Sequence, residues 1–149
     1  MQSMDALFIQ EPLIEHKLTA APKKAKRIFF SDPFIYHAIC SWLQPNYNAE
    51  DCFDNPSLLS SLVETVVINH SRRVYPTYYI KAEGEVDLAY VKDSAFIPIE
   101  IQWGNQLRPK DLKQIKKYPQ GQIWAKVQER HLLEKIPVLP LPRELYEFV

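Results

Sequence analysis

The chain has 149 residues, enough for one domain or for one domain with a short additional segment. Its 18 Lys and Arg residues balance 18 Asp and Glu residues, so the formal net charge is +0, which argues against a histone-like polycation and against an acidic tail. The sequence contains neither a P-loop nor a GxGxxG pattern, and its two cysteines are too few for a disulfide framework or a thiolate metal site.

The start of the chain lacks the features of a secretory signal, and no apolar run reaches the roughly 18 residues that a membrane-spanning helix needs. Asp5, Glu11 and Glu15 interrupt the first segment, which lacks the charged-then-apolar order of a signal peptide. We therefore expect a cytoplasmic protein with no membrane partner.

Residues 1–30 are predicted to form a β-hairpin that precedes the main domain, residues 31–149. Apolar residues within 7–14 form one arm and those within 27–30 the other, and the connection between them is basic. A hairpin alone is barely stable in water. It therefore either packs on the rest of the chain or is the remnant of an absent domain.

Two helices are predicted next, each opened by an acid or amide followed by proline. Asp32-Pro33 supplies an N-cap side chain and a proline at the first helical position, and apolar residues follow at helical spacing. After a polar loop over 45–54, a second helix is expected over 55–72. At 100° per residue, Glu64 lies about 60° outside the main apolar stripe of this helix. Glu64 is therefore predicted to be a carboxylate at the edge of a buried helix.

The second half of the chain is predicted to alternate strands with helices. Period-two alternation indicates strands over 86–91 and 96–103, although Pro98 in the latter tends to place a strand at a sheet edge. The remaining elements are expected to be strands over 78–80, 122–127 and 136–140, a helix over 108–118, and a helix from residue 142 onward. This order predicts an α/β fold, with a mixed sheet flanked by helices on both faces.

Two acids stand where the predicted strand pair would bring them together. If the strands form an antiparallel hairpin, Asp87 and Glu100 are cross-strand neighbours, and two adjacent carboxylates repel unless a positive group lies between them. Mg²⁺ prefers such hard oxygen ligands. A metal site is therefore predicted, with Glu64 as a third carboxylate; the alternative is that Asp87 and Glu100 are two solvated strand acids, and that Glu64 pairs with an Arg or Lys.

These residues resemble the motif of the PD-(D/E)XK, or restriction-endonuclease-like, nuclease superfamily. The motif has an Asp at the end of one strand and Glu-x-Lys on the next, which Asp87 and Glu100-Ile101-Gln102 resemble, and Glu64 matches a helix Glu that often precedes them. The resemblance implies metal-dependent hydrolysis of DNA with Mg²⁺ or Mn²⁺ held by Asp87, Glu100 and Glu64. Gln114 and Tyr118 resemble the QxxxY helix that lines the DNA channel of RecB-like members.

A broader resemblance extends over most of the chain, from about residue 6 to 149. The segments 29–34, 62–64, 84–88 and 98–101 are similar to the C-terminal domain of certain archaeal and bacterial AAA-type ATPases. This resemblance implies that residues 1–30 are the terminal hairpin, or wing, of a winged-helix segment. It also implies an ATPase module as a partner, in cis or in trans. The chain would then be a fragment, a split gene product or a free-standing relative.

Gln102 departs from the motif, because active nucleases have Lys at this position. The resemblance implies that in those enzymes this Lys positions or deprotonates the attacking water and stabilises the charge that develops on the phosphate. Gln can orient water but supplies no charge, and the loss of one electrostatic stabiliser typically costs about 10²–10³ in rate. A Lys from another element, Lys81 or Lys113, is a candidate replacement.

Two classes of function therefore remain open. The first is a metal-dependent nuclease with Asp87, Glu100, Gln102 and Glu64 as its catalytic residues. The second is a catalytically degenerate module that binds nucleic acid or an ATPase. DNA is the expected partner of the first class, and nucleic acid or an ATPase that of the second; neither class predicts an oligomeric state.

Basic residues of the predicted 108–118 helix could bind backbone phosphates next to the acidic site. The candidates for DNA contact there are Lys110, Lys113 and Lys117, together with Gln114 and Tyr118. The basic hairpin connection, from Lys23 to Arg27, is a second candidate surface. For both surfaces the alternative is a face that is merely solvated.

Overall fold

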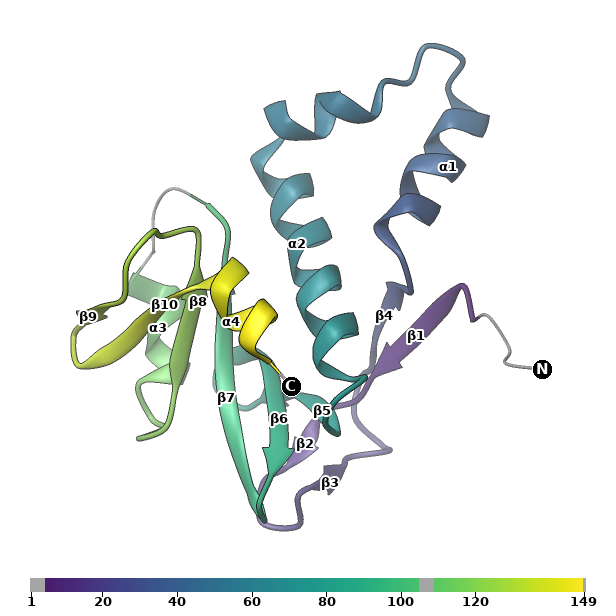
Figure 1. The fold of residues 1–149 in the computed structure, drawn as a ribbon. Coiled ribbons are helices and arrows are strands. Elements are labelled where there is room, and N and C mark those ends of the chain that lie inside the picture. The colour runs from purple at the N-terminus through teal and green to yellow at the C-terminus, as the bar shows by residue number, and fades with distance from the viewer. Residues whose placement is uncertain (1–4, 105–108, 149) are drawn as a thin grey trace.

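The computed structural model describes residues 5–104 and 109–148, the first three of the second range by their backbone alone. Its centre is a six-stranded mixed sheet with the strand order β5-β6-β7-β8-β10-β9 (Figure 1). Four of these strands carry or adjoin the candidate site: β5 (Thr77–Lys81), β6 (Glu85–Lys92), β7 (Ala95–Gln102) and β8 (Gln122–Ala125). The far edge is made by β9 (His131–Leu133) and β10 (Ile136–Pro140). The predicted α/β class and mixed sheet are confirmed.

Helices cover both faces of this sheet. On one face, α2 (Pro56–Ser71) and α4 (Leu141–Glu147) pack on apolar side chains of the central strands, with Val67 and Trp124 at the centre of this core. On the other face, α3 (Pro109–Ile115) buries Leu112 and Ile115 against a second apolar cluster. The sheet therefore has two separate cores, as a mixed sheet with helices on both faces requires.

Strand β7 lies in the middle of the sheet in spite of its proline. Pro98 is opposite Ala89 of β6, and the parallel pairing of β7 with β8 begins only at the next residue, Ile99 opposite Gln122. The missing N–H of the proline therefore falls outside the β7–β8 ladder. Because no hydrogen bond of that ladder is lost, β7 can lie inside the sheet although proline favours edge strands.

Helix α2 begins and ends close to its predicted limits. The Asn55 side chain accepts a hydrogen bond from the Leu58 N–H at 3.1 Å, and Pro56 occupies the first turn, where its missing N–H costs nothing. Val67 and Ile68 are fully buried. No helix among the described residues is both long and apolar enough to cross a membrane.

Three local predictions need correction. The polar segment 45–54 contains a short 3₁₀ helix, η1 (Ala49–Asp54), whose first turn is capped by Asn48. The helix predicted over 108–118 ends at Ile115 and tightens into three-residue turns. Strand β9 was not predicted, because the turn that joins it to β10 places Glu134 and Lys135 at positive φ, where glycine or asparagine is the usual signal.

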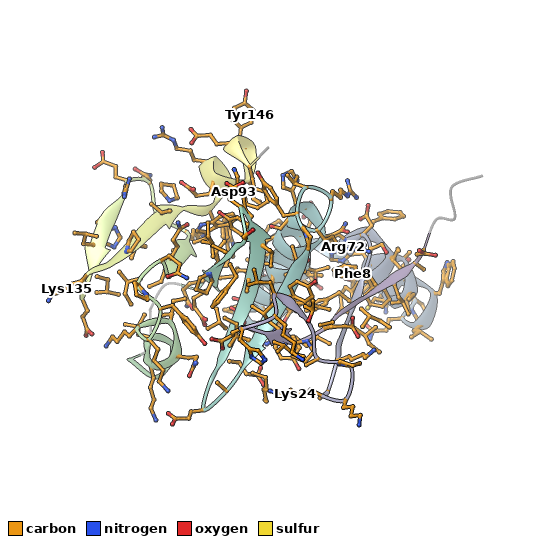
Figure 2. All side chains as sticks on the ribbon, turned by 90° about the horizontal axis from the view of Figure 1, so that it is seen from below. Phe8, Lys24, Arg72, Asp93, Lys135 and Tyr146 are labelled. Atoms are coloured by element: carbon orange, nitrogen blue, oxygen red, sulfur yellow. The ribbon has the colours of Figure 1, made fainter. Side chains whose placement is uncertain are left out.

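The N-terminal segment forms a hairpin-like pair of strands that docks on the edge of the sheet. Strand β1 (Leu7–Gln10) pairs with β4 (Arg27–Phe30) in antiparallel register. The predicted first arm breaks at Pro12, which bridges to Tyr79 of β5, so the next residues form a separate pair, β2 (Leu13–Ile14) with β3 (Thr19–Ala20). Arg72 lies over the Phe8 ring at 4.6 Å, which joins the hairpin to the end of α2 (Figure 2).

Helix α1 (Pro33–Leu43) stands away from both layers (Figure 1). Asp32 caps it by accepting the Phe34 N–H at 2.8 Å, as predicted. None of its residues is buried, even though its sequence is strongly apolar. We refer to α1 and η1, residues 33–54, as the arm.

Candidate functional site

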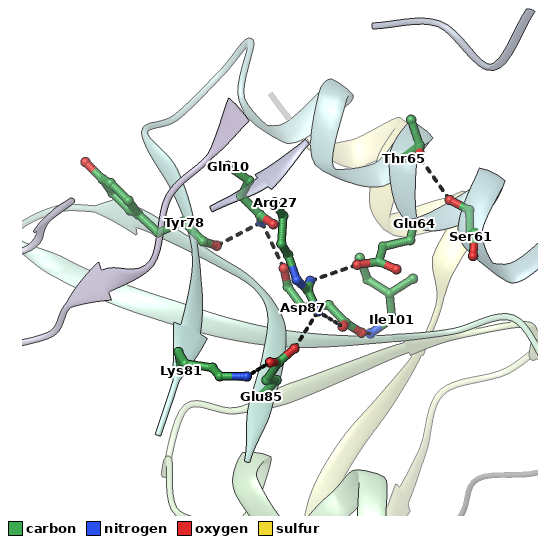
Figure 3. Close-up of polar contacts among 10 residues, drawn as sticks. All are labelled: Gln10, Arg27, Ser61, Glu64, Thr65, Tyr78, Lys81, Glu85, Asp87 and Ile101. Atoms are coloured by element: carbon green, nitrogen blue, oxygen red, sulfur yellow. Dashed lines mark hydrogen bonds and ion pairs between the residues drawn. The ribbon is translucent and has the colours of Figure 1, made fainter. Parts of the chain in front are cut away.

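The candidate site lies where strands β6 and β7 separate. Their ladder ends at the pair Leu88 and Ile99, and continuing this register by one residue places Asp87 opposite Glu100. The Asp87 side chain takes over the pairing at this point, because its Oδ2 accepts the N–H of Ile101 at 3.1 Å (Figure 3). Asp87 is therefore fixed at the end of the ladder by a backbone donor.

A guanidinium group occupies the space between the acids of this site. Arg27, from β4 of the hairpin, places Nη1 2.9 Å from Glu64 Oε1 of α2, and Nη2 2.9 Å from Glu85 Oε2 and 3.6 Å from Asp87 Oδ1 (Figure 3). Three segments far apart in the sequence thus meet on one side chain. We call Arg27, Glu64, Glu85 and Asp87 the acidic cluster.

Contacts with the sheet and within the hairpin fix the position of Arg27. Its guanidinium lies over the Tyr79 ring, 4.9 Å from the centroid, and the Tyr79 hydroxyl donates to the Ala25 carbonyl. Opposite Arg27 in the hairpin, buried Gln10 donates through Nε2 to the carbonyls of Asp87 at 2.9 Å and Tyr78 at 3.2 Å. The Arg27 position is therefore built by contacts from two strands of the main sheet.

Burial and mutual repulsion determine the protonation of the carboxyls. Burial first, and then the negative charge of Asp87, raise the pKa of Glu64 to about 7, against the opposing effect of Arg27. Burial also raises the pKa of Asp87, although the Ile101 N–H and Arg27 oppose it. The Lys81 ammonium, which is ion-paired with Glu85, holds the pKa of Glu85 below its usual value. The three carboxyls thus share two cations, and burial raises the pKa of two of them, Glu64 and Asp87.

Arg27 lies beside two of the three predicted metal ligands. In the part of the chain that the structure describes, no group of three or more His, Cys, Asp or Glu side chains is arranged to hold a metal ion. Glu64 and Asp87 come together, and both contact Arg27, whose guanidinium carries a fixed positive charge.

The other two predicted catalytic residues follow on β7. Glu100 is buried, with 9% of its surface exposed, and pairs in register with Ile123 of β8. Gln102 is half-buried at the end of β7, opposite Ala125. Gly104 lies so close that a Cβ there would be 3.2 Å from the Gln102 amide nitrogen.

The predicted DNA-contact residues of α3 divide into two groups. Gln114 is 3% exposed, accepts the Gly84 N–H at 3.2 Å and donates to the Tyr118 hydroxyl, which in turn donates to Glu15. These contacts join α3 to the β5–β6 turn and to the N-terminal segment. The basic residues behave differently: Lys113 is exposed, Lys117 is exposed and ion-paired with Glu83 at 2.7 Å, and the Lys110 side chain lies outside the described residues.

Neither lysine proposed to replace the lost motif Lys takes that place. Lys81 pairs with Glu85 at the rim of the acidic cluster, and Lys113 belongs to α3, on the opposite face from α2. Sequence reasoning instead missed Arg27, which it grouped with the basic hairpin connection, and it missed Glu85. The only local signal was a charged residue at the start of the apolar run 27–30.

Comparison of the chain with protein-family models, with curated proteins and with solved structures finds no significant match.

Proposed function

We propose that the chain is a nuclease-like domain of the PD-(D/E)XK type that binds DNA without hydrolysing it. The observation that carries this proposal is the position of Arg27, whose guanidinium contacts Glu64, Glu85 and Asp87 where the resemblance calls for a divalent cation. The proposal keeps an ATPase, in cis or in trans, as the system in which such a module would act.

The chemistry of phosphodiester hydrolysis explains why this arrangement would not cleave DNA. A divalent metal lowers the pKa of bound water and so generates the nucleophile, whereas a guanidinium stays protonated and cannot do so. The acids that surround Arg27 raise its pKa further, against the effect of burial. Gln102 adds no positive charge for the transition state. Both the source of the nucleophile and one electrostatic stabiliser are therefore missing.

The DNA-binding part of the proposal depends on helix α3 and the turn that follows it. Lys113, Lys116 and Lys117 lie within one turn of each other there and are exposed, and Lys116 and Lys117 pair with Glu134 and Glu83. Clustered lysines bind phosphates through charge, largely without regard to sequence, and this binding weakens as salt increases. We expect a sequence-independent affinity with a clear salt dependence.

The catalytic half of the proposal is tested with metal and with DNA. Wild-type protein should neither cleave linear or single-stranded DNA in Mg²⁺ or Mn²⁺ nor gain thermal stability from Mn²⁺. Arg27→Gln frees the carboxylates, so Mn²⁺ should raise its unfolding temperature, and adding Asp87→Asn should remove that gain. Metal-dependent cleavage by the wild-type protein that is lost in Glu100→Ala would overturn the proposal.

The DNA-binding half is tested by fluorescence anisotropy with a labelled duplex and a labelled single strand. Lys113→Glu combined with Lys117→Glu should lower the affinity by about tenfold or more and reduce the salt dependence. Arg73→Glu, which reverses an exposed charge just after α2, on the opposite face of the sheet from α3, is the control and should bind as the wild type does. Equal binding by all three proteins would exclude α3 as the DNA surface.

A second candidate, the metal-dependent nuclease, is favoured by one observation. Burial and then the negative charge of Asp87 raise the pKa of Glu64 to about 7 against the effect of Arg27, so Arg27 does not fully offset the other negative charge of the cluster. In this candidate Asp87, Glu100 and Glu64 hold Mg²⁺ or Mn²⁺ and Gln102 orients water. Cleavage that requires Glu100 would select it.

A further inference from the structure

The arm presents apolar side chains that the rest of the described chain does not cover. Trp42 is 83% exposed, Leu43 74% and Phe53 70%, and no residue of α1 is buried. Single exposed apolar residues are ordinary, but three large ones on one protruding segment favour a surface that another molecule covers. The remaining question is which molecule covers this surface of the arm.

The charge of the arm limits which kind of molecule can cover it. The arm, residues 33–54, contains no Lys or Arg and three acids, Glu50, Asp51 and Asp54, so it carries a net charge of −3. The remainder of the chain has all 18 basic residues and 15 acids, a net charge of +3. An acidic apolar surface repels DNA and matches a basic apolar one.

A basic apolar hollow is present at the other end of the same molecule. It has a volume of about 900 Å³ and lies beside β2, β3 and the end of β5. Its lining includes the apolar Leu13 and Ile14 and the charged Glu15, Lys23, Lys24 and Lys81. Because Lys81 pairs with Glu85, Lys23 and Lys24 supply the excess positive charge. Figure 1 places β2 and β3 at the end of the molecule opposite the arm, so the arm and the hollow of one chain cannot meet.

The accessible area of the chain supports a second copy as the occupant. The chain exposes 9853 Å², whereas a compact monomer of 17.5 kDa exposes about 7,900 Å². The excess of about 2,000 Å² exceeds the roughly 800 Å² that each partner buries in a standard interface. It is sufficient for two contacts, one at the arm and one at the hollow.

We infer that the arm of one copy docks in the basic hollow of a second copy, with Trp42, Leu43 and Phe53 on the apolar floor and the acids of η1 near Lys23 and Lys24. Because each copy offers one arm and one hollow, a pair can satisfy both contacts at once, as two-fold symmetry requires. The inference does not depend on the proposed function.

The experiment measures association by sedimentation velocity and light scattering over a range of protein concentrations. Wild-type protein should form dimers, and Trp42→Ser should weaken the association by about tenfold or more, since a large aromatic side chain at an interface centre carries much of the binding free energy. The high exposure of Trp42 means that its loss leaves the fold intact, which circular dichroism checks. Lys135→Glu is the control.

A charge exchange then identifies the two surfaces. One variant reverses the hollow, Lys23→Glu with Lys24→Glu, and the other reverses the arm, Glu50→Lys with Asp54→Lys. Each variant alone should be monomeric, because like charges then meet, whereas an equal mixture should form heterodimers because both contacts regain opposite charges.

Three results would overturn the inference. They are a wild-type protein that stays monomeric at high concentration, a dimer whose affinity none of these variants changes, and a mixture that does not associate. A hollow variant that lowers only DNA affinity, at unchanged mass, would instead assign the hollow to nucleic acid.

Discussion

Arg27 contacts three carboxyl groups through one guanidinium, and its fork-like geometry makes this multiple pairing efficient. Breaking such a cluster leaves buried charges without their partner. Because Arg27 keeps part of its side chain exposed, Arg27→Ala is expected to cost roughly 2–4 kcal/mol, somewhat less than for a fully buried pair. The acidic cluster is thus a structural joint between the hairpin and α2 as well as the candidate site.

The raised pKa of Glu64 predicts an unusual pH dependence of stability. Folded Glu64 holds its proton up to about pH 7, while the unfolded chain releases it near the ordinary value of 4.5. The folded state therefore binds more protons between these values, and the free energy of unfolding falls as pH rises through this interval. Glu64→Gln, which mimics the protonated form, should match the wild type near pH 5 and exceed it near pH 8, by something of the order of 2 kcal/mol.

Urea unfolding at both pH values measures this difference. Glu129→Gln removes an exposed carboxyl and serves as the control, with no pH-dependent advantage. If the advantage of Glu64→Gln does not grow with pH, Glu64 is ionised throughout this range in the folded protein.

At the scale of elements, helix α3 is connected to the β5–β6 turn by one buried side chain. Gln114 accepts the Gly84 N–H, and a Cβ at Gly84 would lie only 3.1 Å from the Gln114 Cβ, so the turn and the helix are in direct contact. Glycine at position 84 is what permits this close approach. The helix that carries Lys113 is therefore fixed relative to Glu85 and Asp87, which follow the turn.

Gln114→Leu tests whether this residue serves the fold or DNA. Leucine fills a similar volume but leaves the Gly84 N–H without its acceptor and removes one of the two hydrogen bonds of the Tyr118 hydroxyl, so the variant should lose about 1–3 kcal/mol of unfolding free energy. The DNA affinity of the folded variant should stay unchanged. Lys113→Gln, on the same helix but exposed, should show the opposite result: unchanged stability and weaker DNA binding. A loss of DNA affinity in Gln114→Leu at unchanged stability would instead support the predicted contact with DNA.

At the scale of the whole molecule, the hairpin and the sheet are expected to unfold together. Gln10 is 2% exposed and donates to the carbonyls of two sheet strands, and Phe8 is buried between Phe29 and Arg72. Gln10→Ala should therefore lower hydrogen-exchange protection in β1, β4 and β6 by the same free energy, about 1–3 kcal/mol. Ile9→Thr changes an exposed residue of the same strand and is the control. A loss confined to β1 and β4 would mean that residues 1–30 form a separate unit.

The sequence predicted the elements whose signals are local. The capped start and apolar stripe of α2, and the alternation in β6 and β7, depend on neighbouring residues, and these elements lie close to where they were expected. Strand β9 lacked such a signal, since Glu134 and Lys135 adopt positive φ without glycine.

Only part of the candidate site could be predicted, because the rest depends on contacts between residues far apart in the sequence. The register of β6 and β7 and the helical position of Glu64 brought two of the acids to one place. Arg27 reaches them from 37 to 60 residues away, through a hairpin whose docking depends on tertiary contacts such as that of Gln10. Nothing in the local pattern around Arg27 indicates that contact, and this one residue changes the chemistry expected of the site.

The charge segregation of the chain also has a consequence for proteolysis. Trypsin cuts after Lys and Arg, so it has no site between Arg27 and Arg72 and would release the arm and α2 as a single fragment, 28–72. Chymotrypsin cuts after large apolar residues and would meet Trp42 and Phe53 at the surface of the arm. The ratio of the two cleavage rates therefore reports how far the arm is covered, in the purified protein or in an extract, without a label or a mutation.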